Sequence, residues 1–246
     1  MTITSEITRI KGNIAEAYTA LSDKGATLPV TQNSANLANT VASIPAGGSG
    51  SGDKYKVGDR VNDDSDNPVG TVSSIFTDGN GDRYAVVCLD AVNRLASGTW
   101  CSDNTTIVTD LPTYNKEQWG PWEAKETATY NTQKILDFCA ANNYTSEACS
   151  HCRSKSFTID GTTYYGQLPN LIELYDIVRN HTALNNADPT ASSYSSVNFS
   201  TGLSWWSSSQ YSSNNAWSTG MMGDMIGSIK NKKSNVVPVL EIPLEE

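Results

Sequence analysis

Residues 205–217, which read WWSSSQYSSNNAW, are the most informative segment for predicting the fold. Two indoles of this stretch, Trp206 and Trp217, lie on either side of a polar run, and each can bury on the order of 150–250 Å² of surface. We predict that both are core residues rather than ligand contacts. Trp205 precedes Trp206 on an expected strand, so its side chain should point the opposite way and is a candidate contact for a ligand.

A second informative stretch lies upstream, at residues 164–174, which read YYGQLPNLIEL. Pro169 cannot continue a strand, because it has no N–H to donate. Asn170 can cap a following helix through its side-chain oxygen. The sequence therefore predicts a helix that begins near Asn170. The apolar face that it should bury consists of Leu171, Leu174, Tyr175 and Val178.

These motifs, taken in chain order, resemble one family, the C-type-lectin-like fold. Formylglycine-generating enzymes, the C-terminal domains of collagen-like bacterial adhesins and retroelement-diversified phage receptor-binding proteins share that fold. The family pattern is Leu-Pro-Ser/Thr and Glu-Leu, then Trp-Ser-Ser, Ala-Trp and a closing Val-Arg-Pro-Val. The matching residues are Leu168-Pro169-Asn170, Glu173-Leu174, Trp206-Ser207-Ser208, Ala216-Trp217 and Val237-Pro238-Val239. The resemblance covers residues 54–246 and implies an α+β, C-type-lectin-like fold; Val237 replaces the usual arginine, which leaves the function open.

The remaining elements of this region are predicted from local patterns. Residues 70–76 and 84–89 read as strands joined by a hairpin turn, DGNGD, at residues 78–82. Residues 55–59 read as a strand and a turn, and residues 132–142 as a helix. After Asp188 the sequence predicts short strands and loops rich in Ser, Asn and aromatic residues, and such loops usually carry function.

The candidate binding surface comes from the resemblance. In the diversified members, side chains between Trp-Ser-Ser and the final strand vary while the backbone keeps its course. The corresponding residues 218–228 read STGMMGDMIGS and hold three of the four methionines, which suit adaptable surfaces. A buried strand that uses methionine is the alternative. The predicted ligand-binding residues are Trp205, Ser207, Ser209, Tyr211, Ser213, Asn214, Ser218, Met221, Met222, Asp224, Met225, Ile226 and Ser228. We predict no catalytic residue, no metal ligand and no cofactor.

The N-terminal region predicts self-association. Residues 1–24 read as a helix with a narrow apolar stripe of Ile3, Ile7, Ile10, Ile14, Ala17 and Leu21, which is the a/d pattern of a coiled coil. Isoleucine at both positions favours trimers; an amphipathic helix packed on its own domain is the alternative. A shorter helix is expected over residues 34–43. Residues 1–45 resemble the start of many phage tail proteins. We therefore predict an oligomerisation and tail-attachment segment over 1–45, a Gly/Ser linker over 46–53 and a receptor-binding domain over 54–246.

Charge and hydropathy narrow the function classes. The net charge of −9 and the lack of a long basic cluster argue against nucleic-acid binding, because phosphate contacts need Lys and Arg. The basic run Lys230-Asn231-Lys232-Lys233 reads as a solvated turn. No apolar run reaches the ~18 residues of a membrane span, and the first ten residues lack the pattern of a signal peptide. We expect no membrane insertion and synthesis in the cytoplasm.

The cysteines admit two interpretations. There are five: Cys88, Cys101, Cys139, Cys149 and Cys152. Residues 149–152 read CSHC and, with Cys139, could supply four zinc ligands. No second CxxC or HxxxH follows at the spacing of a zinc finger. Small buried thiols near a helix end are the preferred interpretation. The DGNGD turn has carboxylate and amide oxygens that could seed a calcium site, but no Glu stands at the twelfth position of an EF-hand loop, so we predict a plain turn.

Together these patterns predict a phage tail adhesin, carried at the tail tip of the virion. Its expected partners are a bacterial cell-surface receptor, protein or glycan, its own copies in a homotrimer, and other phage tail proteins through the N-terminus. An enzyme of the formylglycine-generating type needs a cysteine pair after Trp206, and no cysteine follows Cys152, so we expect no enzyme. A structural tail or baseplate component, or a bacterial surface adhesin, on the same fold is the alternative.

Overall fold

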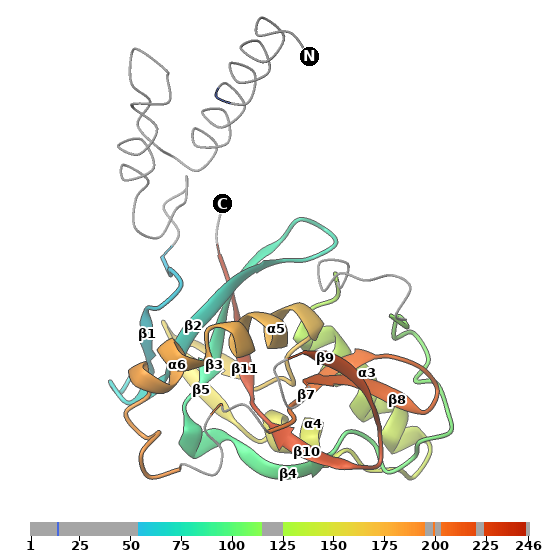
Figure 1. Cartoon of the computed structure of the whole chain (residues 1–246). Coiled ribbons are helices and arrows are strands. Elements are labelled where there is room, and N and C mark those ends of the chain that lie inside the picture. Colours follow the sequence, from blue (N-terminus) through green and yellow to red (C-terminus); the bar gives the residue numbers. More distant parts are fainter. Residues whose placement is uncertain are drawn as a thin grey trace, which may run out of the picture. The chain divides into compact units, whose positions relative to one another are not determined.

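The strands on either side of the DGNGD turn lie at the centre of the main sheet. In a computed structural model of the chain, β2 (Pro68–Thr77) and β3 (Arg83–Leu89) pair antiparallel. With β1 (Arg60–Asn62) and β11 (Val239–Pro243) they form a sheet of order β1-β2-β3-β11 (Figure 1). The predicted hairpin is confirmed, and its turn closes on itself: Asp78 Oδ1 accepts the N–H groups of Asn80 and Asp82 at 2.8 and 3.0 Å.

The structure describes residues 54–114, 125–194, 199, 203–219 and 224–244, together with Ile14. The chain divides into two compact units, Met1–Lys54 with Glu246 and Tyr55–Glu245. The elements described here belong to the second unit, which is mixed α+β with antiparallel strand pairs, as the sequence predicts at this level. The expected coiled coil, short helix and linker lie outside the described residues, apart from Ile14.

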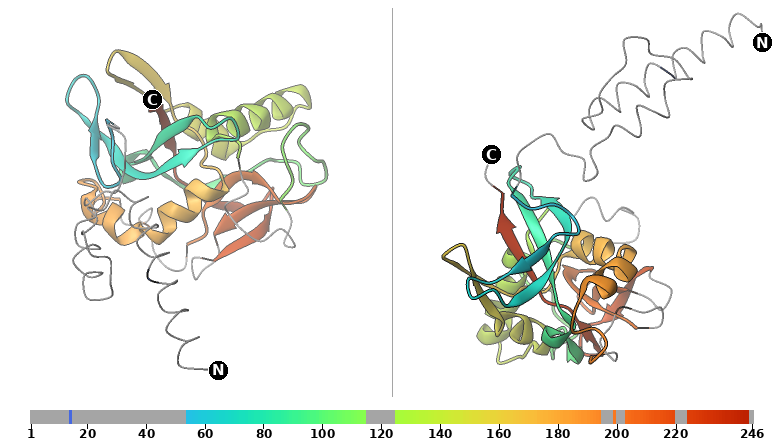
Figure 2. Two further views of the ribbon diagram at one scale, coloured as in Figure 1. Left: turned by 90° about the horizontal axis from the view of Figure 1, so that it is seen from above. Right: turned by 90° about the vertical axis from the view of Figure 1, so that its left-hand side faces the viewer.

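Both faces of the main sheet are covered by other elements. Side chains alternate between the two faces along each strand. From β3, Val86 and Cys88 pack with residues of α5 (Leu171–Arg179) and α6 (His181–Ala187). Val87 and Leu89 point to the other face, where the hairpin of β5 (Ser156–Ile159) and β6 (Thr162–Tyr165) covers them. The right-hand view of Figure 2 shows the helices and the hairpin on opposite sides of the sheet.

The start of α5 follows from the local sequence. Asn170 Oδ1 accepts the Glu173 N–H at 2.9 Å, and Glu173 Oε2 accepts the Asn170 N–H at 2.8 Å, so the predicted cap is a full capping box. Leu171 and Leu174 are buried as predicted. Tyr175 and Val178 are only partly buried, and Ile177 and the Glu173 side chain lie in the core instead.

Two further predictions need correction. The helix expected from residue 132 begins earlier, at Ala128, because Thr127 caps it and Glu241 accepts the N–H groups of Ala128 and Thr129. This helix is α3 (Ala128–Ala141), and α4 (Glu147–Arg153) packs beside it. Residues 55–59 form a turn closed by the Asp59 N–H and the Lys56 C=O, without a strand.

A smaller sheet contains most of residues 205–217. It consists of β7 (Trp206–Gln210), β8 (Asn215–Thr219) and β9 (Met225–Ile229), in that order. Helix α5 contacts β2 of the main sheet and β7 and β8 of this one, so it joins the two (Figure 1). A 3-10 turn, η1 (Ala91–Asn93), leads into β4 (Leu95–Thr99), which pairs with β10 (Lys233–Val236).

Candidate binding surface

The two predicted core indoles fix the smaller sheet. Trp206 and Trp217 are buried, and each donates its ring N–H to a main-chain carbonyl. Trp206 Nε1 reaches Gly98 O at 2.8 Å, and Trp217 Nε1 reaches Tyr114 O at 2.9 Å. The prediction that both are structural is confirmed, because a buried indole whose only polar atom is satisfied holds its position tightly.

Trp205 is not the outward contact that the strand pattern predicts. Its side chain is 1% exposed, and its ring packs against Phe199 with centroids 4.7 Å apart. Trp205 does point away from Trp206, but it enters a second core with Leu174 and Ile177 of α5. The alternation was right and the inference of exposure was wrong, because this segment lies between two hydrophobic cores.

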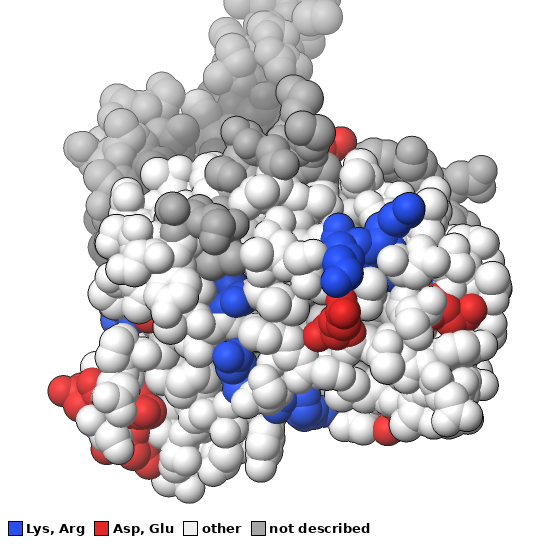
Figure 3. All heavy atoms as spheres, turned by 90° about the horizontal axis from the view of Figure 1, so that it is seen from below, with Lys and Arg blue, Asp and Glu red and all other residues white. Residues whose placement is uncertain are grey.

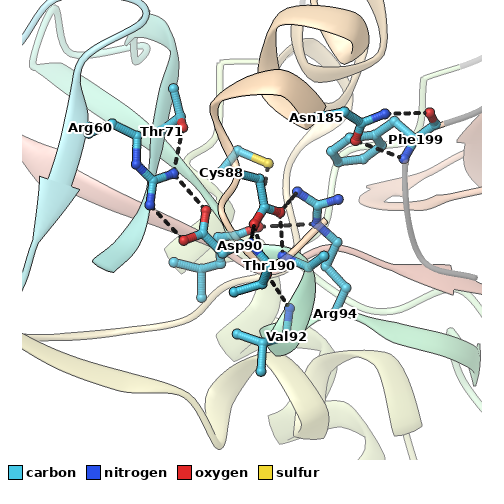
Figure 4. A network of polar contacts seen from close by, with 12 residues as sticks. Arg60, Thr71, Cys88, Asp90, Val92, Arg94, Asn185, Thr190 and Phe199 are labelled. Carbon is cyan, nitrogen blue, oxygen red and sulfur yellow. Dashed lines mark hydrogen bonds and ion pairs between the residues drawn. The ribbon is translucent and has the colours of Figure 1, made fainter. Parts of the chain in front are cut away.

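A polar network holds Phe199 in place (Figure 4). Asn185 exchanges two hydrogen bonds with the Phe199 main chain, at 2.8 and 3.2 Å, and the Arg94 guanidinium lies 4.2 Å from the Phe199 ring centroid. Arg94 also pairs with buried Asp188, at 3.2 Å. Asp188 Oδ2 accepts the Ala91 N–H at 2.6 Å, so the network ties η1 to the segment after α6.

Three predicted binding serines serve the interior instead. Ser207, Ser209 and Ser218 are buried, and their hydroxyl groups are already engaged. Ser207 Oγ donates to Trp217 O at 3.0 Å, and Ser209 Oγ accepts the Leu171 N–H at 3.0 Å. Ser218 Oγ lies 2.7 Å from Ser228 Oγ. A serine-rich strand can be fully buried when each hydroxyl has an internal partner.

The other predicted residues reach solvent where they are described. Asn214 and Asp224 are exposed. Those that are partly buried are Tyr211, Ser213, Met225, Ile226 and Ser228. Met221 and Met222 lie outside the described residues. The predicted residues do not include Ile229, at the end of β9, whose side chain is 41% exposed. The signal was available, because Ile229 directly follows Ser228, the last residue of the predicted variable segment 218–228.

Strand β9 is the outer strand of its sheet as far as the described residues show, and its register defines what it offers. The Lys230 N–H donates to Asn214 O at 3.0 Å, so these two residues form a hydrogen-bonded pair. The adjacent pair, Asn215 and Ile229, is therefore a non-hydrogen-bonded pair. Pairs of this kind alternate along an antiparallel ladder. The main-chain groups of Met225, Gly227 and Ile229 therefore point away from β8.

An aromatic side chain lies directly over β9. A Cβ on Gly227 would come within 2.8 Å of the Tyr211 ring, so only glycine permits this close approach. The Tyr211 ring also meets the Trp217 ring edge-on, with centroids 4.9 Å apart. Tyr211 is thus a half-buried aromatic held rigidly beside Met225.

The basic run after β9 is only partly a solvated turn. Lys232 and Lys233 are exposed, but Lys230 is 1% exposed. Its Nζ donates to Gln210 Oε1 at 2.8 Å and to Thr106 O at 3.0 Å, and it lies 5.0 Å from the Trp100 ring centroid. Burial lowers the pKa of Lys230 to about 8. This lysine ties the loop around Thr106 to the end of β7.

The residues of the candidate zinc motif, CSHC at 149–152, have other surroundings. His151 Nε2 lies 2.7 Å from Asn93 O, while Cys149 and Cys152 are fully buried. Within the described ranges, no group of three or more His, Cys, Asp or Glu side chains is placed to hold a metal ion.

Uncharged side chains predominate on the face drawn in Figure 3, where Lys, Arg, Asp and Glu form a few small groups. Among the described residues, no helix combines the length and apolarity that crossing a bilayer requires. Comparison of this chain with protein-family models, with curated proteins and with solved structures gives no match.

Proposed function

We propose that this chain is a phage tail adhesin that binds a bacterial surface receptor through β9 and the adjoining β7–β8 turn. The observation that carries the proposal is a contrast within one small sheet. Every residue of β7 and most of β8 are buried, whereas four residues of β9 are half-buried and Ile229 is exposed. A rigid frame thus presents a strand whose side chains are partly free for contact.

The chemistry of this surface suits recognition. Asn214, Ser213 and Ser228 supply hydroxyl and amide groups, while Met225 and Ile226 supply flexible apolar ones. Tyr211 adds an aromatic ring with few rotatable bonds, which is the mixture that paratopes use. Between residues 224 and 229, Asp224 has the one ionisable side chain. We therefore propose that this surface binds the receptor and catalyses no reaction on it.

The lectin-like fold is part of the same proposal. The motif residues that suggest it are structural here: Asn170 caps α5, Trp206 and Trp217 are core residues, and Val237 and Val239 are buried. The last strand, β11, pairs with β3, so the C-terminal end of the domain is part of the main sheet. The proposal of a trimeric stalk rests on the a/d stripe alone. Three linked copies would bind a cell more tightly than one copy by a factor on the order of 10²–10⁴.

The proposal is tested by binding of the labelled full chain to intact cells from a panel of bacterial species. Ile229→Asp places a charge on the proposed surface. Val57→Asp is the matched control, since Val57 is 54% exposed and lies outside the small sheet. We expect saturable binding to at least one species, weakened about tenfold by Ile229→Asp and unchanged by Val57→Asp.

Treating the cells with protease or with periodate beforehand separates a protein receptor from a glycan. Equal effects of the two aspartate variants, at unchanged melting temperature, would remove β9 from the binding surface. A chain that forms trimers and binds no cell would favour the structural tail component.

A further inference from the structure

Two thiols from distant parts of the chain meet in the core beneath the small sheet. Cys101 follows β4, and Cys139 lies in the last turn of α3, 38 positions later. Their Sγ atoms are 3.6 Å apart, both side chains are buried, and both are free thiols. Since a disulfide bond is ~2.05 Å long, the sulfurs need to approach by about 1.5 Å to form one.

The backbone beside this pair is already joined. The Ser102 N–H donates to Thr145 O at 2.7 Å, and the Thr145 N–H donates to Ser102 Oγ at 2.9 Å. The Tyr144 N–H returns to Cys139 O at 2.8 Å. A covalent bond between the two sulfurs would therefore link segments that hydrogen bonds hold side by side, with little change of the main chain.

The hydrogen bond between the two thiols favours the ionisation of one of them. The hydrogen bond with Cys139 lowers the pKa of Cys101 to about 7, and the ammonium group of Lys230 acts in the same direction with a smaller effect. The same hydrogen bond, together with burial, raises the pKa of Cys139. A thiolate is the nucleophile in disulfide exchange, so Cys101 is suited to attack.

The other three cysteines differ in this respect. Burial raises the pKa of Cys88 to about 11 and that of Cys149 to about 12, and it raises the pKa of Cys152 as well. Cys88 lies in a different hydrophobic cluster from the pair. Of the five cysteines, Cys101 is thus the one whose pKa is lowered, and its sulfur already touches a second one.

We propose that Cys101 and Cys139 form an oxidation site whose co-reactant is a low-molecular-weight disulfide such as glutathione disulfide. The Cys101 thiolate attacks one glutathione sulfur, the glutathione S–S bond breaks, and one glutathione thiolate leaves. Cys139 gives its proton to that thiolate and attacks Cys101 Sγ, which expels the second glutathione. Two protein thiols become one disulfide, and glutathione disulfide is reduced to two glutathione molecules. Because both thiols are buried, the reagent enters during folding or local opening.

Such a bond would distinguish the protein before and after it leaves the cell. A reducing cytoplasm keeps both thiols in the reduced form, and an oxidising exterior favours the disulfide bond. This order of compartments rests on the proposed function, whereas the reactivity of the thiol pair does not.

The test uses the full chain, unfolded and then refolded in glutathione buffers of increasing oxidised-to-reduced ratio, so that burial does not limit access. Digestion without reduction, followed by mass spectrometry, identifies the linked peptides. We expect a Cys101–Cys139 link, with the loss of two hydrogen atoms and a melting temperature raised on the order of 10 °C. Cys101→Ser and Cys139→Ser should each abolish the link and the shift, and Cys149→Ser should keep both.

A Cys149–Cys152 link in place of the expected one would overturn the proposal, as would a chain that stays reduced at every ratio or a shift that survives in Cys101→Ser. Binding to cells, measured on the oxidised and the reduced chain, keeps the two ideas separate. Absence of binding by both forms would count against the adhesin and leave the disulfide result intact.

Discussion

The buried carboxyl group of Glu173 gives a sharp prediction about pH. This residue is fully buried, and its Oε1 has no hydrogen-bond partner among the described residues. Burial first, and then the neighbouring Glu241 carboxylate, raise the pKa of Glu173 well above its ordinary value. Glu241 in turn accepts the N–H groups of Ala128 and Thr129 at the start of α3. In the folded protein Glu173 therefore holds its proton to a higher pH than in the unfolded chain.

The sign of the pH effect follows from this proton. In the unfolded chain Glu173 ionises near pH ~4.3, so above that pH folding must take up a proton. Stability is fully present below this value and falls as pH rises, by about 1.4 kcal/mol per pH unit, until the raised pKa of the folded state is reached. Glu173→Gln removes this dependence, because an amide does not titrate in this pH range, while its carbonyl oxygen can still accept the Asn170 N–H.

The assay is thermal unfolding of both proteins at half-unit steps from pH 4.5 to 7.5. The variant should gain on the natural protein by about 3–6 °C per pH unit at the start of this range, as expected for a domain of this size. Glu241→Gln is the control with the opposite sign, since an amide cannot accept two helix N–H groups as a carboxylate does, and it should be destabilising throughout. A gap between Glu173→Gln and the natural protein that does not widen with pH would refute the reasoning.

Three further predictions follow from the core and the stalk. The pKa of Lys230 is lowered to about 8 by burial, so the stability of the natural protein should rise between pH ~8 and ~10, as the folded state releases this proton first; Lys230→Met should lack that rise in urea titrations. Trp205→Ala removes the ring that packs on Phe199 and should lower the free energy of unfolding by about 3–5 kcal/mol, measured in urea; a change below ~1 kcal/mol would mean that the indole is not buried. The a/d stripe predicts that the natural chain sediments as a trimer and that Ile7→Asp with Ile14→Asp sediments as a monomer, whereas a natural chain that sediments as a monomer would contradict the stalk.

Local patterns predicted those parts of the fold that depend on short-range physics. The Asp78–Asp82 hairpin and the Asn170 cap each follow from a few neighbouring residues, and both are present. Trp206 and Trp217 could be assigned to the core because their size makes exposure unfavourable. The start of α3 could not be predicted, because its N-terminal N–H groups are satisfied by Glu241, which lies more than a hundred positions away in the chain.

The errors in the candidate site share one cause. A strand pattern states which way a side chain points but not whether a second layer covers that side. Trp205 is buried because Phe199 and α5 cover its face, and Ser207 is buried because its hydroxyl reaches Trp217 O. Lys230 reads as part of a basic turn, yet buried Gln210 and the Thr106 carbonyl supply acceptors for its ammonium group. The outcomes for Trp205 and Lys230 depend on contacts with segments far apart in the sequence, and that for Ser207 on a neighbouring strand ten positions away.

These corrections restrict where the surface can vary without loss of the fold. A buried serine whose hydroxyl satisfies a main-chain group cannot change freely, because its replacement leaves a buried N–H or C=O unpaired, which costs about 1–3 kcal/mol. Ser207 and Ser209 are bound in this way. Asn214 and Ile226 carry no such bond to the frame among the described residues. If binding specificity evolves on this domain, substitutions should therefore accumulate on β9 and the β7–β8 turn and spare β7, even though serine makes both segments look equally polar.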